Sequence, residues 1–397
     1  MRQPPGQSVG EILRFTIHNR VVLTLAFLLL FAAGLPLLNW APNRLVSGQP
    51  LFMQQLLEGK GLLLLFPVGL LIALVFLPQS RVSLGLMLIC SELLFIALII
   101  TSGREAGLLA QRGSELARTS FSSGFWLSAA LCLLIAAEAI SHLTTKALWR
   151  LLLNGQIWLP VIVILVSGQL DQLALLKEYA NRQDVFDQAL SRHLLLLVGT
   201  LLPTLLIGLP LGWCCYRFQT AQSAVFAILN IIQTIPSVAL FGLLLAPLSG
   251  LARQFPLFKE LGISGIGLAP ALIALVLYAL LPLVRSVVAG LQNVPREVTE
   301  TAWGMGMTRS QIFWQTEMPL ALPVMLAGLR VITVQTMGMA VVAALIGAGG
   351  FGAIIFQGLF SSALELVLLG VIPVVALAVI ADGLFKFVIT AMEAARQ

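Results

Sequence analysis

Charged residues are scarce in this chain of 397 residues, at 10% of the sequence, whereas soluble domains carry roughly 25%. Hydrophobic residues make up 59% of it. This balance excludes an ordinary soluble domain and indicates that lipid is the usual surroundings of the chain. The net charge of +6 fits ordinary membrane topology, and no clustered basic patch indicates binding to nucleic acid.

Groups that do chemistry are also few and scattered. The sequence has no Gly-rich phosphate loop ending in Lys-Ser or Lys-Thr, so this chain is not expected to hydrolyse ATP itself. The three histidines stand apart near the ends of apolar runs: His18, His142 and His193. The four cysteines lie within or at the ends of such runs: Cys90, Cys132, Cys214 and Cys215. We therefore expect no catalytic site, bound cofactor or metal centre in this chain.

Long apolar runs are what the sequence does contain. A membrane-spanning helix needs about 20 mostly apolar residues. These runs lack the alternation of barrel strands, so all of them are expected to be helices. The ten candidate spans are 21–39, 61–78, 82–101, 124–140, 151–168, 194–213, 224–246, 270–290, 322–345 and 366–389. The predicted fold class is an all-α polytopic membrane protein with about ten transmembrane helices.

The first apolar run follows basic residues, as a signal peptide would. It is too long for a typical signal core and has no small-residue cleavage pattern, so we expect it to be a mature span. A small excess of Lys and Arg in alternate loops favours a cytosolic N-terminus. Ten spans then place both termini in the cytosol.

Residues 169–193 are polar, mixed in charge and compatible with a helix. We expect them to form an external amphipathic linker. It would join an N-terminal five-span extension, residues 1–168, to a second five-span domain, residues 194–397. No clear internal repeat relates the two halves.

A polar stretch, residues 295–319, separates two of the spans in the second half. Pro295 suits the start of a helix, and Val298, Ala302 and Met305 follow at helical spacing on one narrow apolar face. Thr308 and the glutamine three residues later match a capping box, which predicts a second helix that stops before a proline. The stretch therefore predicts two short helices on the cytosolic side.

This stretch resembles the cytosolic coupling loop of permease subunits of bacterial ABC importers, whose pattern is Glu-Ala-Ala, three residues, Gly, nine residues, Ile-x-Leu-Pro. Four positions match it: Glu300, Ala302, Gly306 and Pro319. Three depart from it: Thr301, Thr316 and Met318. The resemblance implies a type I ABC importer permease core with its coupling loop at 293–319. A generic amphipathic connector is the alternative that the loop alone leaves open.

Three further strings resemble osmoprotectant importer permeases of the glycine betaine and choline group: residues 233–247, 277–287 and 344–352. In the front half, residues 116–127 and 177–187 resemble the YehY-type permeases. The resemblance implies a multi-pass subunit of the bacterial inner membrane that works with a cytosolic ABC ATPase dimer, where ATP binds. It also implies a periplasmic substrate-binding protein and a second permease, with a related hetero-partner favoured over a second copy of this chain.

Prolines and glycines mark candidate positions for a gated path. Pro236 and Pro282 lie inside predicted spans, where a missing N–H bends a helix and frees carbonyls that neighbours must satisfy. The glycines near the outer end of the ninth span permit a tight backbone break. The candidates for gate and path are Pro236, Tyr278, Pro282, Gly347, Gly349 and Gly350. The alternative for the glycines is that they only end and pack a helix.

Arg285, Arg330 and Asp382 fall at a similar depth, roughly 10 Å from the cytosolic face at 1.5 Å per helical residue. An unpaired charge in a span is costly, so we expect Asp382 to pair with one of the two arginines. Independent snorkelling to the inner interface is the alternative. Glu92, in the third span, has no obvious counter-charge and is expected to be a protonated or hydrogen-bonded structural carboxyl, with an ion site as the alternative.

Two other functions remain to be weighed against an ATP-driven importer of glycine betaine or a related quaternary ammonium solute. An ion-coupled secondary transporter would usually show related halves with matching broken helices. An intramembrane enzyme would need paired acids or a Ser or His constellation, and none converges in the sequence. The few Trp and Tyr residues form no convergent cage for a quaternary ammonium group, so specificity is expected to come from the binding protein.

Overall fold

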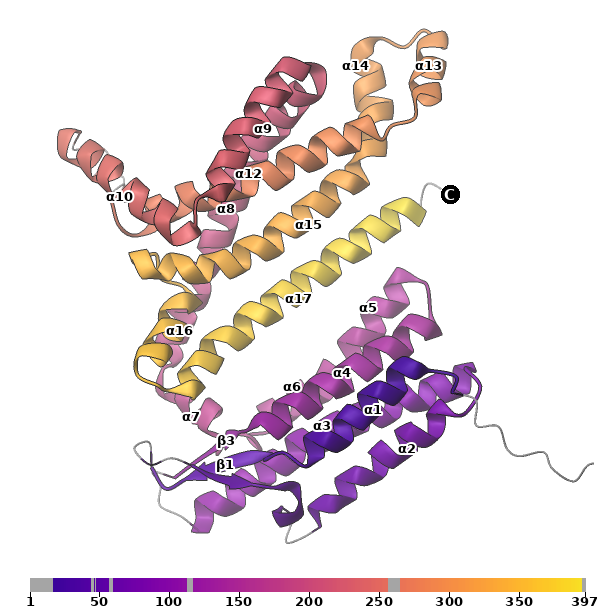
Figure 1. Ribbon diagram of the computed structural model, residues 1–397, viewed down its shortest axis with the longest axis vertical. Coiled ribbons are helices and arrows are strands. Elements are labelled where there is room, and N and C mark those ends of the chain that lie inside the picture. The colour runs from indigo at the N-terminus through magenta and orange to yellow at the C-terminus, as the bar shows by residue number, and fades with distance from the viewer. Residues whose placement is uncertain are drawn as a thin grey trace, which may run out of the picture. The chain divides into compact units, whose positions relative to one another are not determined.

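The computed structural model describes residues 17–43, 46, 48–56, 60–112, 117–255 and 265–394 (Figure 1). The chain is mostly helical, as the sequence predicts. It divides into two compact units, Met1–Lys177 and Glu178–Gln397. Each unit builds its own apolar core, and the two are described separately.

The first unit is a helical bundle with a small sheet at one end (Figure 1). Helix α3 packs against α4 and α2, and α1 packs against the same two helices. Apolar side chains of all four, including Val22, Leu71, Leu98 and Ile135, are fully buried between them. The elements are α1 (Arg20–Ala33), β1 (Leu38–Ala41), β2 (Gln49–Leu51), η1 (Met53–Gln55), η3 (Gly61–Leu64), α2 (Leu65–Val75), α3 (Arg81–Arg112), β3 (Arg118–Phe121), α4 (Ser123–Leu143), α5 (Ala147–Gln156) and α6 (Trp158–Val166).

The sheet corrects the prediction that residues 21–39 form one continuous span. Helix α1 ends at Ala33, and Gly34 caps it. Beyond the cap, Leu38 begins strand β1, which lies between β2 and β3 with antiparallel pairing on both sides. The chain leaves the helix because a glycine followed two residues later by a proline disfavours another helical turn. Apolar composition alone did not distinguish the strand from the helix before it.

The second unit is built around one buried helix, α12. This helix contacts α8, α9, α10 and α15. A Cβ atom at Gly208 or Gly212 of α8 would lie 2.6 Å from the side chain of Leu283 or Val287 of α12, so the glycines allow the close approach. The elements are α7 (Ala174–Asn181, across the boundary), α8 (Gln183–Arg217), α9 (Gln219–Thr234), α10 (Ser237–Gln254), α12 (Leu268–Gln292), α13 (Arg296–Gly304), α14 (Arg309–Ile312), the π-helical turn η4 (Phe313–Glu317), α15 (Met318–Val342), η5 (Ala343–Ile346), α16 (Phe351–Phe360) and α17 (Leu364–Ala394).

Within the described ranges, eight helices are long and apolar enough to cross a membrane, and three shorter apolar helices accompany them. The predicted spans 21–39 and 61–78 are two of the shorter helices. The predicted span 224–246 is wrong as a single helix, because the chain breaks at Ile235 and Pro236 between α9 and α10. The predicted linker 169–193 contains α7 and the first residues of the long helix α8, so its polar residues continue directly into a membrane helix.

Candidate functional site

The polar stretch between α12 and α15 folds into two short helices, α13 and α14, as predicted (Figure 1). Helix α13 ends in a Schellman motif: the Met307 N–H donates to the Ala302 carbonyl at 3.2 Å, and the Gly306 N–H donates to the Trp303 carbonyl at 2.9 Å. Gly306 has φ of +79°, a conformation that strains residues with a Cβ. The turn between the two helices therefore needs glycine at this position.

The predicted capping box is present at the start of α14. The Thr308 hydroxyl accepts from the Gln311 N–H, and the Gln311 side chain accepts from the Thr308 N–H at 2.8 Å. The predicted stop before Pro319 is wrong. A π-helical turn follows α14 and runs directly into α15, so Pro319 lies within one continuous helical stretch, Arg309–Ile346.

Exposure divides the residues that match the importer pattern. Glu300, Gly306 and Pro319 are exposed, whereas Ala302 is 1% exposed. Of the three residues on the predicted apolar face, Ala302 packs inward, whereas Val298 and Met305 are 39% and 71% exposed. The outward apolar surface of this loop also carries Trp303, and Arg309 stacks over its ring at 5.9 Å.

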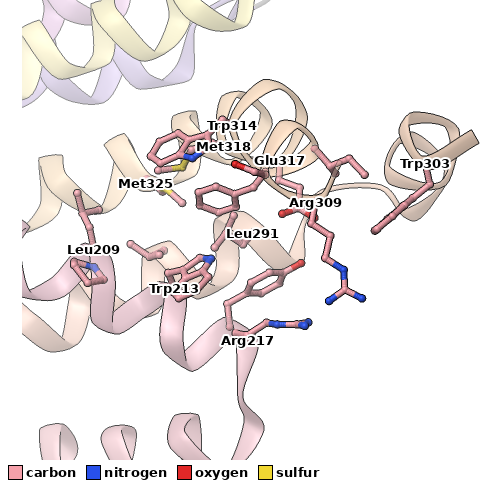
Figure 2. A pocket seen from close by; sticks show the side chains of 16 residues that line it. Leu209, Trp213, Arg217, Leu291, Trp303, Arg309, Trp314, Glu317, Met318 and Met325 are labelled. Atoms are coloured by element: carbon pink, nitrogen blue, oxygen red, sulfur yellow. The ribbon is translucent and has the colours of Figure 1, made fainter. Parts of the chain in front are cut away.

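A pocket of about 800 Å³ lies beside this loop, between the last turns of α8, helix α12 and the start of α15 (Figure 2). Apolar side chains line part of it, among them Leu209, Leu291 and Met325. The polar part is lined by Arg217 and Arg309, with Glu317 on the π-helical turn. No local pattern in the sequence indicates this pocket, because its walls come from four separate segments.

Hydrogen bonds connect the break at Pro236, just before α10, to the part of α12 that contains Tyr278 and Pro282. Pro282 has no N–H for the carbonyl of Tyr278, one helical turn earlier, and the side-chain amide of Gln233 donates to that carbonyl at 2.8 Å. In return, the Tyr278 hydroxyl donates to the carbonyl of Ile235, at the break before Pro236. The freed carbonyls are thus satisfied by neighbouring helices, as expected. Gln233 was not predicted, although a glutamine within an apolar run is a signal for such a role.

The candidate glycines form a tight turn between η5 and α16. Gly347, Gly349 and Gly350 have φ of +81°, +82° and +75°. The carbonyl of Ala348, in the middle of this turn, accepts from Nε of Arg192 on α8 at 2.9 Å. The predicted break is present, and its bonding to Arg192 was not foreseen.

A buried histidine lies beneath the glycine turn. His193 is fully buried, and neither ring nitrogen has a hydrogen-bond partner within the described part of the chain. Its ring contacts Phe351, with 5.4 Å between the ring centroids. A Cβ atom at Gly350 would lie 3.3 Å from Nδ1 of this ring. The turn is therefore closely packed on α8 and cannot accept a larger residue at that point without movement.

The structure brings two of the three candidate charges together. Nε of Arg330 on α15 lies 2.5 Å from Oδ1 of Asp382 on α17. Lys386 also reaches Asp382, at 2.8 Å from its second carboxylate oxygen. Arg285 is apart from this cluster and donates instead to Oδ1 of Asn230 on α9, at 2.7 Å.

Glu92, in the first unit, accepts a hydrogen bond from the side-chain amide of Gln156 at 2.5 Å. This is the hydrogen-bonded carboxyl that the sequence favoured over an ion site. No group of three or more His, Cys, Asp or Glu side chains suited to a metal occurs among the described residues.

Two family models match the chain, one in each half. Residues 19–176 match the N-terminal domain of the ABC transporter permease YehY. Residues 204–393 match the binding-protein-dependent transport system inner membrane component. The glycine turn, the proline pair and the loop with α13 and α14 all lie within the second match.

Curated relatives match the second half. The osmoprotectant import permease protein OsmW of Salmonella typhimurium is 36% identical over 197 residues, which cover 49% of this chain and 85% of the relative. The glycine betaine/carnitine/choline transport system permease protein OpuCD of Bacillus subtilis is 34% identical over 196 residues, covering 49% and 79%. A solved structure of the MetNI methionine ABC transporter in an inward-facing conformation has 21% identity and a TM-score of 0.46, covering 53% of this chain and 97% of its own.

The matching family model and the curated relatives are transport permease subunits, and in ABC importers the ATPase is a separate subunit. They also identify a multi-pass protein of the inner membrane, consistent with its apolar helices. The chain therefore belongs to the family of permease subunits of binding-protein-dependent ABC importers, and its N-terminal domain is of the YehY type.

Proposed function

We propose that this chain forms the membrane path of an ATP-driven importer for glycine betaine or a related quaternary ammonium osmoprotectant. The solute class is supported by the names of two relatives that are 34% and 36% identical to this chain over the aligned residues of its second half. The observation that carries the proposal is the two-helix loop between α12 and α15, turned at Gly306. Such a loop gives a cytosolic motor a rigid point of attachment to the bundle.

In this proposal, the cytosolic ATPase dimer seats against the loop around Glu300, Ala302, Gly306 and Pro319. The exposure of Trp303 and Met305, at 51% and 71%, supports a partner on this surface. Ala302 contributes from inside, since its small side chain lets α13 lie close to the rest of the loop. Movement of the ATPase on binding ATP would then be transmitted through η4 into α15.

The path itself is proposed to run past the proline pair, Pro236 and Pro282, with Tyr278 between them and the glycine turn at the outer end. The reciprocal hydrogen bonds at this point support this placement, because they hold the break before Pro236 beside the turn of α12 that contains Tyr278 and Pro282. Gly347, Gly349 and Gly350 would let α16 change its angle without displacing α15.

The remaining parts of the assembly follow from the same proposal. Both termini face the cytosol, and residues 169–193 face the periplasm, where a substrate-binding protein delivers the solute. A second permease completes the path, and a related subunit is favoured over another copy of this chain. Residues 1–168 are an N-terminal extension outside the permease domain at 194–397.

Uptake by the purified complex in proteoliposomes tests the proposal. We expect accumulation of radiolabelled glycine betaine or choline only with the binding protein outside and ATP at the ATPase. A complex with a catalytically inactive ATPase is the matched control and should show none. Uptake that follows a proton or sodium gradient and ignores ATP would support the ion-coupled transporter instead and would overturn the proposal.

A further inference from the structure

The pocket beside the coupling loop changes from apolar to charged along two of its walls (Figure 2). On α8, Leu209 and Pro210 line one end, and Arg217 lines the other. Eight helical residues separate Leu209 from Arg217, or about 12 Å along the axis. The pocket is therefore amphipathic along its length.

The opposite wall has the same polarity. Glu317 begins this wall near the loop, and Met318 and Met325 continue it away from the loop on α15. Helix α8 runs toward the loop and α15 runs away from it, so the polar ends of both walls meet at the loop side. Arg309, from α14, adds a second guanidinium there.

Aromatic side chains surround the change from apolar to polar. Trp213, Trp303 and Trp314 line the pocket and are 45%, 51% and 63% exposed. In Figure 2 the guanidinium groups of Arg217 and Arg309 project toward the same side of the pocket. Tryptophan and arginine together are typical of the headgroup level of a membrane.

We propose that this pocket binds one anionic phospholipid of the inner leaflet. The two guanidinium groups outnumber the single carboxylate of Glu317, which lies close enough to Arg217 for their charges to interact. An arginine pair binds a phosphate group by charge and by directed hydrogen bonds. The apolar part accepts the upper acyl chains, so a double-chained lipid fits the whole pocket, whereas a free phosphate fits only its rim.

The proposal rests on the cytosolic placement of the coupling loop. In this proposal the coupling loop contacts two partners, the ATPase and the bound lipid. A lipid held between α8 and α14 would couple the position of the loop to the charge of the inner leaflet.

Native mass spectrometry of the purified complex tests the proposal through the count and affinity of bound lipid. The complex is delipidated and titrated with phosphatidylglycerol or phosphatidylcholine. We expect one tightly held phosphatidylglycerol and at least tenfold weaker binding of phosphatidylcholine. Arg217→Gln and Arg309→Gln should each weaken phosphatidylglycerol about tenfold. Arg296→Gln, an exposed arginine of the same loop that does not line the pocket, is the matched control and should not.

A second pair of variants tests the apolar part. Leu209→Trp fills the pocket and should reduce phosphatidylglycerol binding, while Leu206→Trp, on the exposed side of the same helix, should leave it unchanged.

Equal binding of both lipids, or equal effects of pocket and control variants, would overturn the proposal. If glycerol phosphate competes for the pocket as strongly as phosphatidylglycerol does, the pocket binds only the phosphate group and not the acyl chains, which would overturn the proposal. Loss of the ATPase from the arginine variants with unchanged lipid would assign the pocket to the subunit interface and also overturn it. The lipid count uses neither ATP nor solute, so its failure is separate from a failure of transport.

Discussion

The side-chain amide of Gln233 donates to the backbone carbonyl of Tyr278 at 2.8 Å, and this is the carbonyl that Pro282 leaves without a partner. The Tyr278 hydroxyl donates back to the carbonyl of Ile235 at the break between α9 and α10. Two proline-dependent defects in neighbouring helices are therefore satisfied by each other's side chains. We predict that this exchange of hydrogen bonds stabilises the kinked state of both helices.

Replacing Gln233 with leucine should remove the donor and leave the Tyr278 carbonyl unsatisfied in an apolar setting. We expect a loss of about 1–2 kcal/mol in stability, seen as a lower midpoint of thermal unfolding in detergent. Gln219→Leu, on the exposed start of the same helix, is the control and should unfold as the wild type does. If the two variants unfold at the same temperature, the amide does not stabilise the kink.

The pair between Arg330 and Asp382 should matter more than the neighbouring pair with Lys386. Lys386 is 59% exposed and lies one helical turn beyond Asp382 toward the C-terminal end of α17, whereas Arg330 and Asp382 are 32% and 29% exposed and face each other. We expect Arg330→Gln to cost about 1–2 kcal/mol, and Lys386→Gln only a few tenths. Thermal unfolding of the two variants measures the difference.

A charge swap separates a pair from two independent charges. Arg330→Asp combined with Asp382→Arg should recover part of the stability that either single change loses. Recovery should be incomplete, because Lys386 would then face an arginine. A swapped protein no more stable than its single variants would favour independent snorkelling of the two side chains.

Gly306 and Gly304 offer a matched pair for the coupling loop. Alanine at either position meets no neighbouring atom within 4 Å, but only Gly306 has a positive φ. Gly306→Ala should strain the turn by about 1 kcal/mol and reduce ATP-driven uptake several-fold, while Gly304→Ala should not. Uptake and the amount of ATPase retained on tagged permease measure both effects. If Gly306→Ala and Gly304→Ala show the same uptake and retain the same amount of ATPase, the turn at Gly306 is not required for coupling.

The glycine turn before α16 can be tested in the same way. Gly350→Ala combines a φ of +75° with a contact of 3.3 Å to His193, whereas Gly338→Ala on α15 enters open space. We expect Gly350→Ala to slow uptake at least several-fold in protein that still folds and retains the ATPase. Normal uptake would mean that the glycines only end a helix and pack its neighbour.

Local signals in the sequence predicted the two short helices of the loop between α12 and α15 and the cap of the second one. Thr308 and Gln311 predicted a capping box, because a cap depends on a few adjacent residues. Asp382 was predicted to pair with either Arg330 or Arg285, because a charge in an apolar run needs a partner at its own depth, and the structure pairs it with Arg330. Arg285 also lies in an apolar run, but its partner is the side-chain oxygen of Asn230. Because this amide is uncharged, a search of the sequence for opposite charges does not find it.

Other features depend on tertiary context. Apolar composition predicted a span at 224–246, but the carbonyl of Ile235 finds a donor in Tyr278, so the helix can break at Pro236. Leu38 pairs in a strand because β2 and β3 lie beside it, and β3 is distant from it in the sequence. The inward position of Ala302 likewise depends on how α13 folds back toward η4.

Site-specific cross-linking shows directly whether the loop that contains α13 and α14 contacts the ATPase. A photo-reactive side chain at position 305, where Met305 is 71% exposed, should yield an adduct with the ATPase in the native complex. The same group at position 360, where Phe360 is 81% exposed at the end of α16, should yield none. If the loop contacts the motor subunit, the ATPase should be cross-linked from position 305 and not from position 360. No adduct at 305, or labelling of that position from the periplasmic side, would contradict it.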